Sequence, residues 1–97
     1  MTTEPAALKC VLRLYIAGRT PNSIKAIGNL RRMAEEFVRE CETEIVDLLH
    51  DPMRALEDDI IATPTLIKKF PPPERRVIGN LGDIQRTLTQ LGLLLPE

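Results

Sequence analysis

The spacing of apolar residues along the chain predicts alternating strands and helices. Short runs rich in aliphatic and β-branched residues, bounded by Gly, Pro or Asp, are typical of strands, whereas apolar residues that recur every three or four positions are typical of helices. On this basis we expect strands over residues 8–17, 44–49, 65–70 and 75–80, and helices over residues 21–40, 53–59 and 84–91. The predicted order is therefore β-α-β-α-β-β-α.

The expected helix starts are marked by residues that cap helices. Thr20 precedes Pro21, Asp51 precedes Pro52, and Asp83 precedes the last helix. A Thr or Asp side chain accepts a hydrogen bond from a free N–H of the first turn, and Pro fits the first helical position because it lacks an N–H. In the longest helix we expect one stripe to face the core: Ile24, Ile27, Leu30, Ala34, Phe37, Val38 and Cys41.

Proline residues concentrate around the third predicted strand. Pro64 precedes this strand, and Pro71, Pro72 and Pro73 follow it. Because proline cannot donate a hydrogen bond to a sheet ladder, these residues give the strand abrupt ends. They also bring several X-Pro bonds, whose cis and trans forms interconvert slowly, into one segment. We therefore expect any conformational switch to be encoded here.

A strand, a crossover helix and a parallel strand, followed by a hairpin and a closing helix, form the core topology of thioredoxin-like folds. We expect one such α/β domain over residues 1–97, with residues 1–7 flexible. In redox enzymes of this fold, a C-x-x-C motif stands where the first strand enters its helix. Residues 20–23 occupy that position and read TPNS, without sulfur. The sequence therefore favours a capped helix here and argues against a thiol enzyme.

Composition excludes other classes of function. The net charge is −1 at pH 7, with one Tyr, two Phe and no Trp, so neither a basic surface nor a stacking platform for nucleic acid is indicated. No apolar run approaches the ~18 residues of a membrane span, and the start of the sequence lacks a basic leader. We therefore expect a cytoplasmic protein. Cys10 and Cys41 form no C-x-x-C pair, and we expect both to be reduced and buried.

The remaining polar residues suggest neither a metal nor a cofactor. His50 is the only histidine and has no partners at ligand spacing, so we expect it on the surface. The consecutive acids at 57–59 splay around a short helix, and we expect them to be solvated. Basic residues gather near the prolines: Lys68, Lys69, Arg75 and Arg76. They are equally consistent with a solvated strand edge and with a docking surface for an acidic partner.

Several segments together resemble the KaiB family of circadian clock proteins. They are LRLYIAG at 12–18, RTPNS at 19–23, IVDLL at 45–49 and, most specifically, ATPTLIKKFPPPERRVIGNL at 62–81. The resemblance covers residues 8–94. It implies a non-enzymatic regulator that binds a KaiC-like RecA-type ATPase, with KaiA or a SasA-like kinase as a competitor.

The resemblance also implies site residues. Lys68, Arg75 and Arg76 match basic positions of the family and are the expected partner-binding residues. KaiB proteins switch between a thioredoxin-like monomer and a ground-state fold of order β-α-β-β-α-α-β, which associates into dimers or tetramers. The expected positions of this fold switch are Pro64, Pro71, Pro72, Pro73, Gly79 and Asn80.

Some positions depart from the family pattern. Glu44 and Asp59 stand where the family carries basic residues, and Asn80 stands where it carries Asp. These departures keep a second possibility open, a thioredoxin-like sensor or docking module for a histidine kinase or a stress-response partner, without a clock role. Between the two folds we expect the thioredoxin-like one, because Asp51 and Asp83 both start helices in that arrangement.

Overall fold

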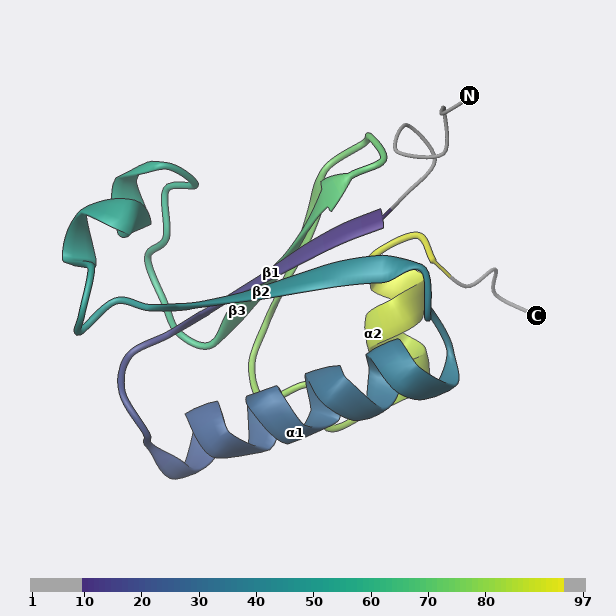
Figure 1. Cartoon of the computed structure of the whole chain (residues 1–97), viewed down its shortest axis with the longest axis horizontal. Helices are drawn as coiled ribbons and strands as arrows, with labels where there is room; N and C mark the ends of the chain where they lie inside the picture. Colours follow the sequence, from purple (N-terminus) through teal and green to yellow (C-terminus); the bar gives the residue numbers. More distant parts are fainter. Residues whose placement is uncertain (1–9, 94–97) are drawn as a thin grey trace, which may run out of the picture.

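The computed structural model describes residues 10–93, which form a four-stranded sheet with two α-helices on one side (Figure 1). The elements are β1 (Cys10–Ile16), α1 (Pro21–Glu36), β2 (Cys41–Asp47), the 3₁₀ helix η2 (Pro52–Leu56), β3 (Thr65–Phe70), β4 (Arg75–Ile78) and α2 (Ile84–Gln90). The predicted thioredoxin-like order is confirmed, with a 3₁₀ helix as the middle helix. The alternative ground-state order is not the one adopted.

The sheet has the strand order β2-β1-β3-β4, so β2 and β4 are its edges. β1 pairs in parallel with β2 and antiparallel with β3, and β3 pairs antiparallel with β4. At the centre of the sheet, Leu14 lies opposite Ile45 on one side and Leu66 on the other. The parallel pair requires a crossover, which α1 supplies.

Two of the three predicted helix caps are confirmed. Thr20 Oγ1 accepts a hydrogen bond from Ser23 N at 3.1 Å, and Asp83 Oδ1 accepts one from Arg86 N at 3.0 Å. The prediction for Asp51 is wrong, because its side chain makes no capping hydrogen bond. A capping side chain of Asp51 would accept a hydrogen bond from the backbone N–H of Arg54. In the 3₁₀ geometry this N–H already donates to the Asp51 carbonyl.

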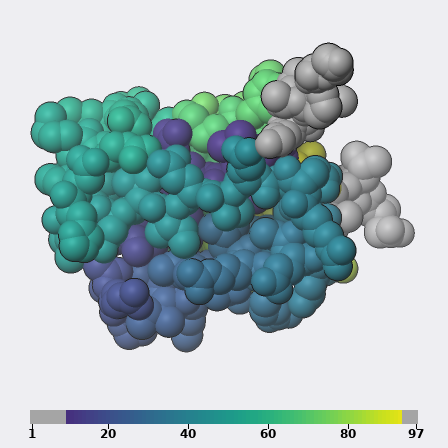
Figure 2. All heavy atoms as spheres, viewed as in Figure 1, coloured from purple at the N-terminus to yellow at the C-terminus, as the bar shows by residue number. Residues whose placement is uncertain are grey.

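Different parts of the chain cover the two faces of the sheet. α1 and α2 cover one face over the larger core cluster: Cys10, Leu12, Leu14, Ile16, Ala26, Leu30, Met33, Val38, Leu66, Leu81, Leu88 and Leu91. The segment 48–62, which contains η2, lies against the other face and forms one end of the molecule (Figures 1 and 2). Its Leu48 and Ile60 pack on a smaller cluster of Tyr15, Val46 and Ile67.

The buried face of α1 differs from the predicted stripe. Its buried residues are Ser23, Ala26, Leu30 and Met33, whereas Ile24 and Phe37 are 52% and 48% exposed. The prediction counted only apolar residues and therefore passed over Ser23, which is small enough to let the helix approach the sheet. The helix also ends at Glu36, so Cys41 lies in β2 and not at the end of α1.

Some expectations fall outside the described residues. The flexible lead at 1–7, the first residues of the strand predicted at 8–17, and the last four residues are among them. Within residues 10–93, no helix is both long and apolar enough to cross a membrane.

Candidate functional site: a basic groove beside β4 and an ion network behind it

A groove of about 780 Å³ lies between β4 and α2. It is lined by residues 75–83 and by Arg86, Thr87 and Gln90. These include three arginines but a single carboxylate, that of Asp83, which is also engaged in capping α2. The groove is therefore positively charged, although the chain carries a net charge of −1.

Two of the groove arginines have free guanidinium groups within the described part of the chain. Arg76 Nη2 lies 3.6 Å from Glu74 Oε2, but neither Arg75 nor Arg86 forms an ion pair with a carboxylate of residues 10–93. An unpaired guanidinium is a strong donor for carboxylate or phosphate oxygens. The groove can therefore bind an acidic group of a partner.

The structure separates the three predicted partner-binding residues. Lys68 pairs with Arg75 across β3 and β4 on the face toward α2, whereas Arg76 points to the opposite face. Lys68 is only 4% exposed. A methyl group added to Gly92 would lie 3.5 Å from Lys68 Nζ and 3.8 Å from Arg75 Nε, so both side chains end beside the turn after α2. Lys68 thus adds charge below the surface without offering contact area.

Arg86 lines the groove but was not among the predicted site residues. It lies in the first turn of α2, where the N–H of Arg86 donates to the Asp83 cap. The sequence placed Arg86 on a helix but gave no sign that this helix returns beside β4. Only residues 79–83 separate β4 from α2, and it is the turn formed by these residues that places Arg75 and Arg86 in one groove.

The floor of the groove turns at Gly79 and Asn80. Gly79 has a φ of +125°, which L side chains rarely adopt, and its N–H donates to the Pro64 carbonyl at 2.9 Å. Asn80 Oδ1 accepts a hydrogen bond from Gly82 N at 3.0 Å, and the Asn80 carbonyl accepts one from Asn29 Nδ2 at 2.8 Å. An aspartate could accept the same bond from Gly82, so this turn does not depend on the amide nitrogen of Asn80.

The prolines bracket β3 as predicted. Pro64 is buried before the strand, and Pro71, Pro72 and Pro73 are exposed in the turn to β4. The peptide bonds Thr63–Pro64, Phe70–Pro71 and Pro72–Pro73 are cis. The structure therefore joins the proline segment, through Gly79, to the floor of the basic groove.

The prediction that the acids at 57–59 are all solvated is wrong. Asp58 is 5% exposed, and its carboxylate lies against the face of the sheet opposite α1. It accepts hydrogen bonds from Tyr15 Oη at 2.6 Å, from Arg13 Nη1 at 3.0 Å and from Lys69 Nζ. These donors come from β1 and β3, so they lie close to Asp58 only when the sheet is folded.

Asp58 and its three donors are part of an ion network, which extends across the sheet to η2. Arg13 Nε donates to Glu44 Oε1 at 2.8 Å, and Arg54 Nη2 donates to Glu44 Oε2 at 3.1 Å. On the other side of Asp58, Lys69 Nζ also donates to Glu74 at 3.2 Å. Glu44 is therefore held between two arginines. It is an internal partner of η2, so its charge is neutralised within the chain.

The network shifts the ionisation of its members. Burial acts to raise the pKa of Asp58, but hydrogen bonds from Lys69, Tyr15 and Arg13 outweigh it and hold this pKa below its ordinary value. The hydrogen bond with Asp58 raises the pKa of Lys69. Burial, together with the same carboxylate, raises the pKa of Tyr15. The network is therefore built from charged acids and bases and joins the segment 48–62 to β1 and β3.

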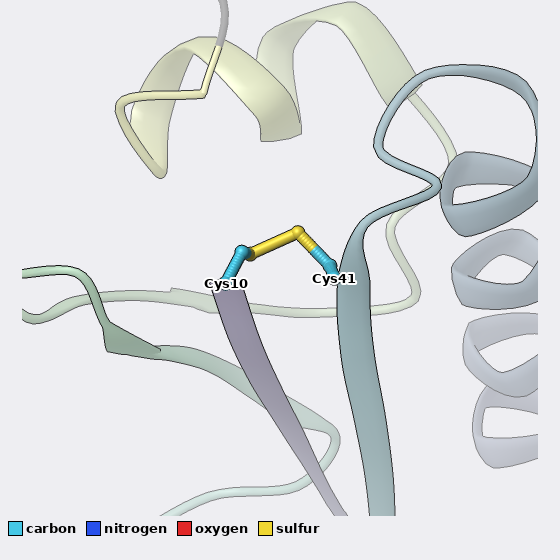
Figure 3. The surroundings of a disulfide bond; sticks show 2 residues. All are labelled: Cys10 and Cys41. Atoms are coloured by element: carbon cyan, nitrogen blue, oxygen red, sulfur yellow. A yellow bond between two sulfur atoms is a disulfide. The ribbon is translucent and has the colours of Figure 1, made fainter. Parts of the chain in front are cut away.

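The prediction that both cysteines are reduced is also wrong. Cys10 and Cys41 form a disulfide between the first residues of β1 and β2 (Figure 3). They are direct partners in the parallel register, with Cα atoms 4.2 Å apart. Because β1 rises ~3.3 Å per residue, the bond lies about 20 Å from the other end of β1, and thioredoxin-like enzymes carry their thiols beyond that end, at the start of α1. It therefore cannot serve as the active site of a thioredoxin.

The other candidates remain without a chemical role. The prediction for His50 is confirmed, because its side chain is 85% exposed; its Nε2 lies 3.7 Å from Asp47 Oδ2. Thr20 caps α1 by accepting a hydrogen bond from the backbone N–H of Ser23, and its hydroxyl donates to Ser23 Oγ. Among residues 10–93, no group of three or more His, Cys, Asp or Glu side chains is arranged to hold a metal ion.

The fold defines the class of this protein. It is similar to chloroplastic thioredoxin z (TM-score 0.73, 17% identity, 92% of this chain and 84% of that one) and to mitochondrial thioredoxin 3 from Saccharomyces cerevisiae (TM-score 0.72, 14% identity, 89% and 79%). These similarities establish a thioredoxin-like domain.

The family is identified by sequence. The profile of the KaiB domain matches residues 13–93. The chain is 49% identical over 88 residues to the circadian clock oscillator protein KaiB of Synechococcus sp. (strain RCC307), covering 90% of this chain and 80% of that one. It is 48% identical over 88 residues to the protein of the same name from Prochlorococcus marinus (strain MIT 9312), covering 90% and 84%. The chain belongs to the KaiB family.

Proposed function

We propose that this chain is a non-enzymatic KaiB-type regulator in the cytoplasm, which binds a KaiC-like RecA-type ATPase and alters its phosphorylation or signalling state within a biological rhythm. The observation that carries this proposal is the match to the KaiB family over residues 13–93. Clock oscillator proteins of this name are identical to the chain at about half of 88 aligned residues, which make up 90% of its length.

The basic groove is the proposed contact with the ATPase. Arg75 and Arg86 present at one surface guanidinium groups that form no ion pair with residues 10–93, whereas Arg76 points to the opposite face of the sheet and lies beside Glu74. Complementary charges accelerate association and select the partner. KaiA or a SasA-like kinase is expected to compete for the resulting complex. The buried Lys68 adds to the positive electrostatic potential at the surface of the groove but does not contact the partner.

Co-elution of the purified chain with the KaiC-like ATPase of its own organism tests the proposal. Both proteins are mixed with ADP, with ATP, or without nucleotide, and are passed over a size-exclusion column. We expect a complex in at least one nucleotide state. Absence of a complex in all three, together with co-elution of the chain with a histidine kinase, would replace the proposal with that of a kinase sensor module.

We further propose that the second half of the chain switches fold, as in the family. Pro64, the prolines at 71–73, Gly79 and Asn80 are the positions that would rearrange, and the ground-state fold would associate into dimers or tetramers. Two packings separated by a few kcal/mol suffice for such a switch. Multi-angle light scattering across concentrations, together with NMR, provides the test. Oligomers in which residues 84–90 become strand support the switch; a monomer with one set of helical resonances there removes it.

A further inference from the structure

The disulfide between Cys10 and Cys41 has no part in the proposed function. It lies on the face of the sheet that α1 and α2 cover, since Cys10 belongs to the larger core cluster and Cys41 packs against it. Cys10 is 4% exposed, whereas Cys41 is only partly buried. Figure 3 shows the two sulfur atoms spanning the gap between β1 and β2. The bond is thus placed where an edge strand begins.

The position of the bond makes β2 depend on it. β2 is an edge strand, and β1 is its one neighbour in the sheet. The disulfide closes a loop between residues 31 apart in sequence, which contains all of α1. Once the bond is open, the first residue of β2 is held to the sheet by the β1 ladder alone. Strand ends at a sheet edge are regions where local opening is easiest.

We propose that Cys10–Cys41 is a reversible redox modification site, opened by dithiols such as a protein C-x-x-C pair, and that its state sets the order of β2. A reductant thiolate attacks the Sγ atom of Cys41, the less buried of the two cysteines, and forms a mixed disulfide. Cys10 leaves as a thiolate and takes up a proton. The second thiolate of the reductant then attacks the sulfur atom that the reductant contributes to the mixed disulfide. This forms the disulfide of the reductant and releases Cys41 as a thiolate, which takes up a proton.

The exchange is balanced without any further reactant. Two electrons and two protons pass from the dithiol to the chain, which gains two thiols, and the reductant becomes a disulfide. An oxidised dithiol reverses the reaction. In a reducing compartment, glutathione and thioredoxin systems keep thiols reduced, so disulfides that form there are usually transient and catalytic or redox-sensing.

The expected effect follows from the length of the loop. For residues 31 apart, the chain-entropy relation predicts that reduction raises the unfolding equilibrium constant roughly 500-fold. Amides that exchange only by global unfolding should accelerate by the same factor. In the reduced chain, the amides of β2 (Cys41–Asp47) should exchange faster than those of β3 through local opening, because β3 is paired on both sides.

Native thiol counting and hydrogen exchange test the proposal on the full chain. The air-oxidised protein is incubated with dithiothreitol without denaturant, thiols are trapped with a maleimide, and exchange is followed by mass spectrometry. We expect no trapped thiol before reduction, two afterwards, and faster exchange of β2. Two free thiols in the air-oxidised protein, or unchanged exchange of β2 after both thiols are trapped, would overturn the proposal.

A double variant provides the matched control. Cys10→Ser with Cys41→Ser should exchange like the reduced wild type and should not respond to dithiothreitol. A response of the variant equal to that of the wild type would show that another group is responsible. If the variant does not fold, the comparison of the oxidised with the reduced wild type still tests whether the disulfide controls the exchange of β2. No partner ATPase is needed, so this inference and the proposed function can fail separately.

Discussion

Replacing Asp58 with Asn tests whether the ion network stabilises the fold. Asp58 is 5% exposed and accepts hydrogen bonds from Tyr15, Arg13 and Lys69. Asn removes the charge and converts one acceptor oxygen into a donor that faces the same cations. Tyr15 keeps an acceptor in the variant, but one of the two cations loses its buried partner.

The size of the effect follows from the surroundings of the two cations. Removing one partner of a buried ion pair costs about 3–5 kcal/mol. Arg13 and Lys69 retain second carboxylates, those of Glu44 and Glu74, and their side chains are 20% and 25% exposed. Some of the loss is therefore compensated, and we expect Asp58→Asn to lower the free energy of unfolding by about 3 kcal/mol. For a domain of this size, the midpoint temperature should fall by about 15 °C.

Urea unfolding of Asp58→Asn and Asp59→Asn measures this effect against a matched control. Asp59 is exposed, forms no ion pair with residues 10–93 and has a φ of +51°, which Asn tolerates as well as Asp. We expect Asp59→Asn to stay within about 0.5 kcal/mol of the wild type. If Asp58→Asn were equally neutral, the buried network would not hold the segment 48–62 to the sheet.

The pH dependence gives a second test of the same network. The pKa of Asp58 in the folded chain lies below its unfolded value of about 3.9. Its stabilising contribution is therefore complete above pH ~4 and is lost as the pH falls through the folded pKa. The stability difference between wild type and Asp58→Asn should be constant from pH 5 to 7 and should shrink in more acidic solution. A difference that grows on acidification would contradict the assigned direction.

Further substitutions probe the caps, turns and core by urea unfolding. Thr20→Ala removes the cap of α1 and should cost about 1 kcal/mol. Gly79→Ala should cost about 1–3 kcal/mol because its φ is +125°, whereas Gly28→Ala, inside α1 with open space around it, should stabilise by about 0.5–1 kcal/mol. Leu88→Ala, 1% exposed, should cost about 3 kcal/mol, and Leu49→Ala, 71% exposed, less than about 0.5 kcal/mol; similar values for the two leucines would show that the core is misassigned.

Local features were predictable from the sequence. The caps Thr20 and Asp83 act within three residues, and Pro64 and Pro71 end β3 through their own missing N–H groups. The element order follows from such signals, and so does the fold class. The exception, η2, shows the limit of the approach, because a five-residue helix has too few hydrogen bonds for a cap to decide its type.

Long-range features were not predictable in the same way. The partners of Asp58 lie 11 to 45 residues away, and Cys10 lies 31 residues from Cys41. Strand register brings Cys10 and Cys41 together, whereas Asp58 reaches its partners because the segment 48–62 packs on the sheet. The groove combines both kinds of feature, since Arg75 was predicted from its sequence motif, whereas Arg86 depends on where α2 packs.

The most direct test of the proposed function is the affinity of the KaiC-like ATPase for a variant that carries both Arg75→Glu and Arg86→Glu. Arg19→Glu, an exposed site outside the groove, makes half of this charge change and serves as the control. Because reversing charges at a docking surface typically costs 2 kcal/mol or more, we expect the double variant to bind at least about 30-fold more weakly and Arg19→Glu to bind within about threefold of the wild type. Equal affinities of the double variant and the wild type would contradict the assignment of the groove as the docking surface.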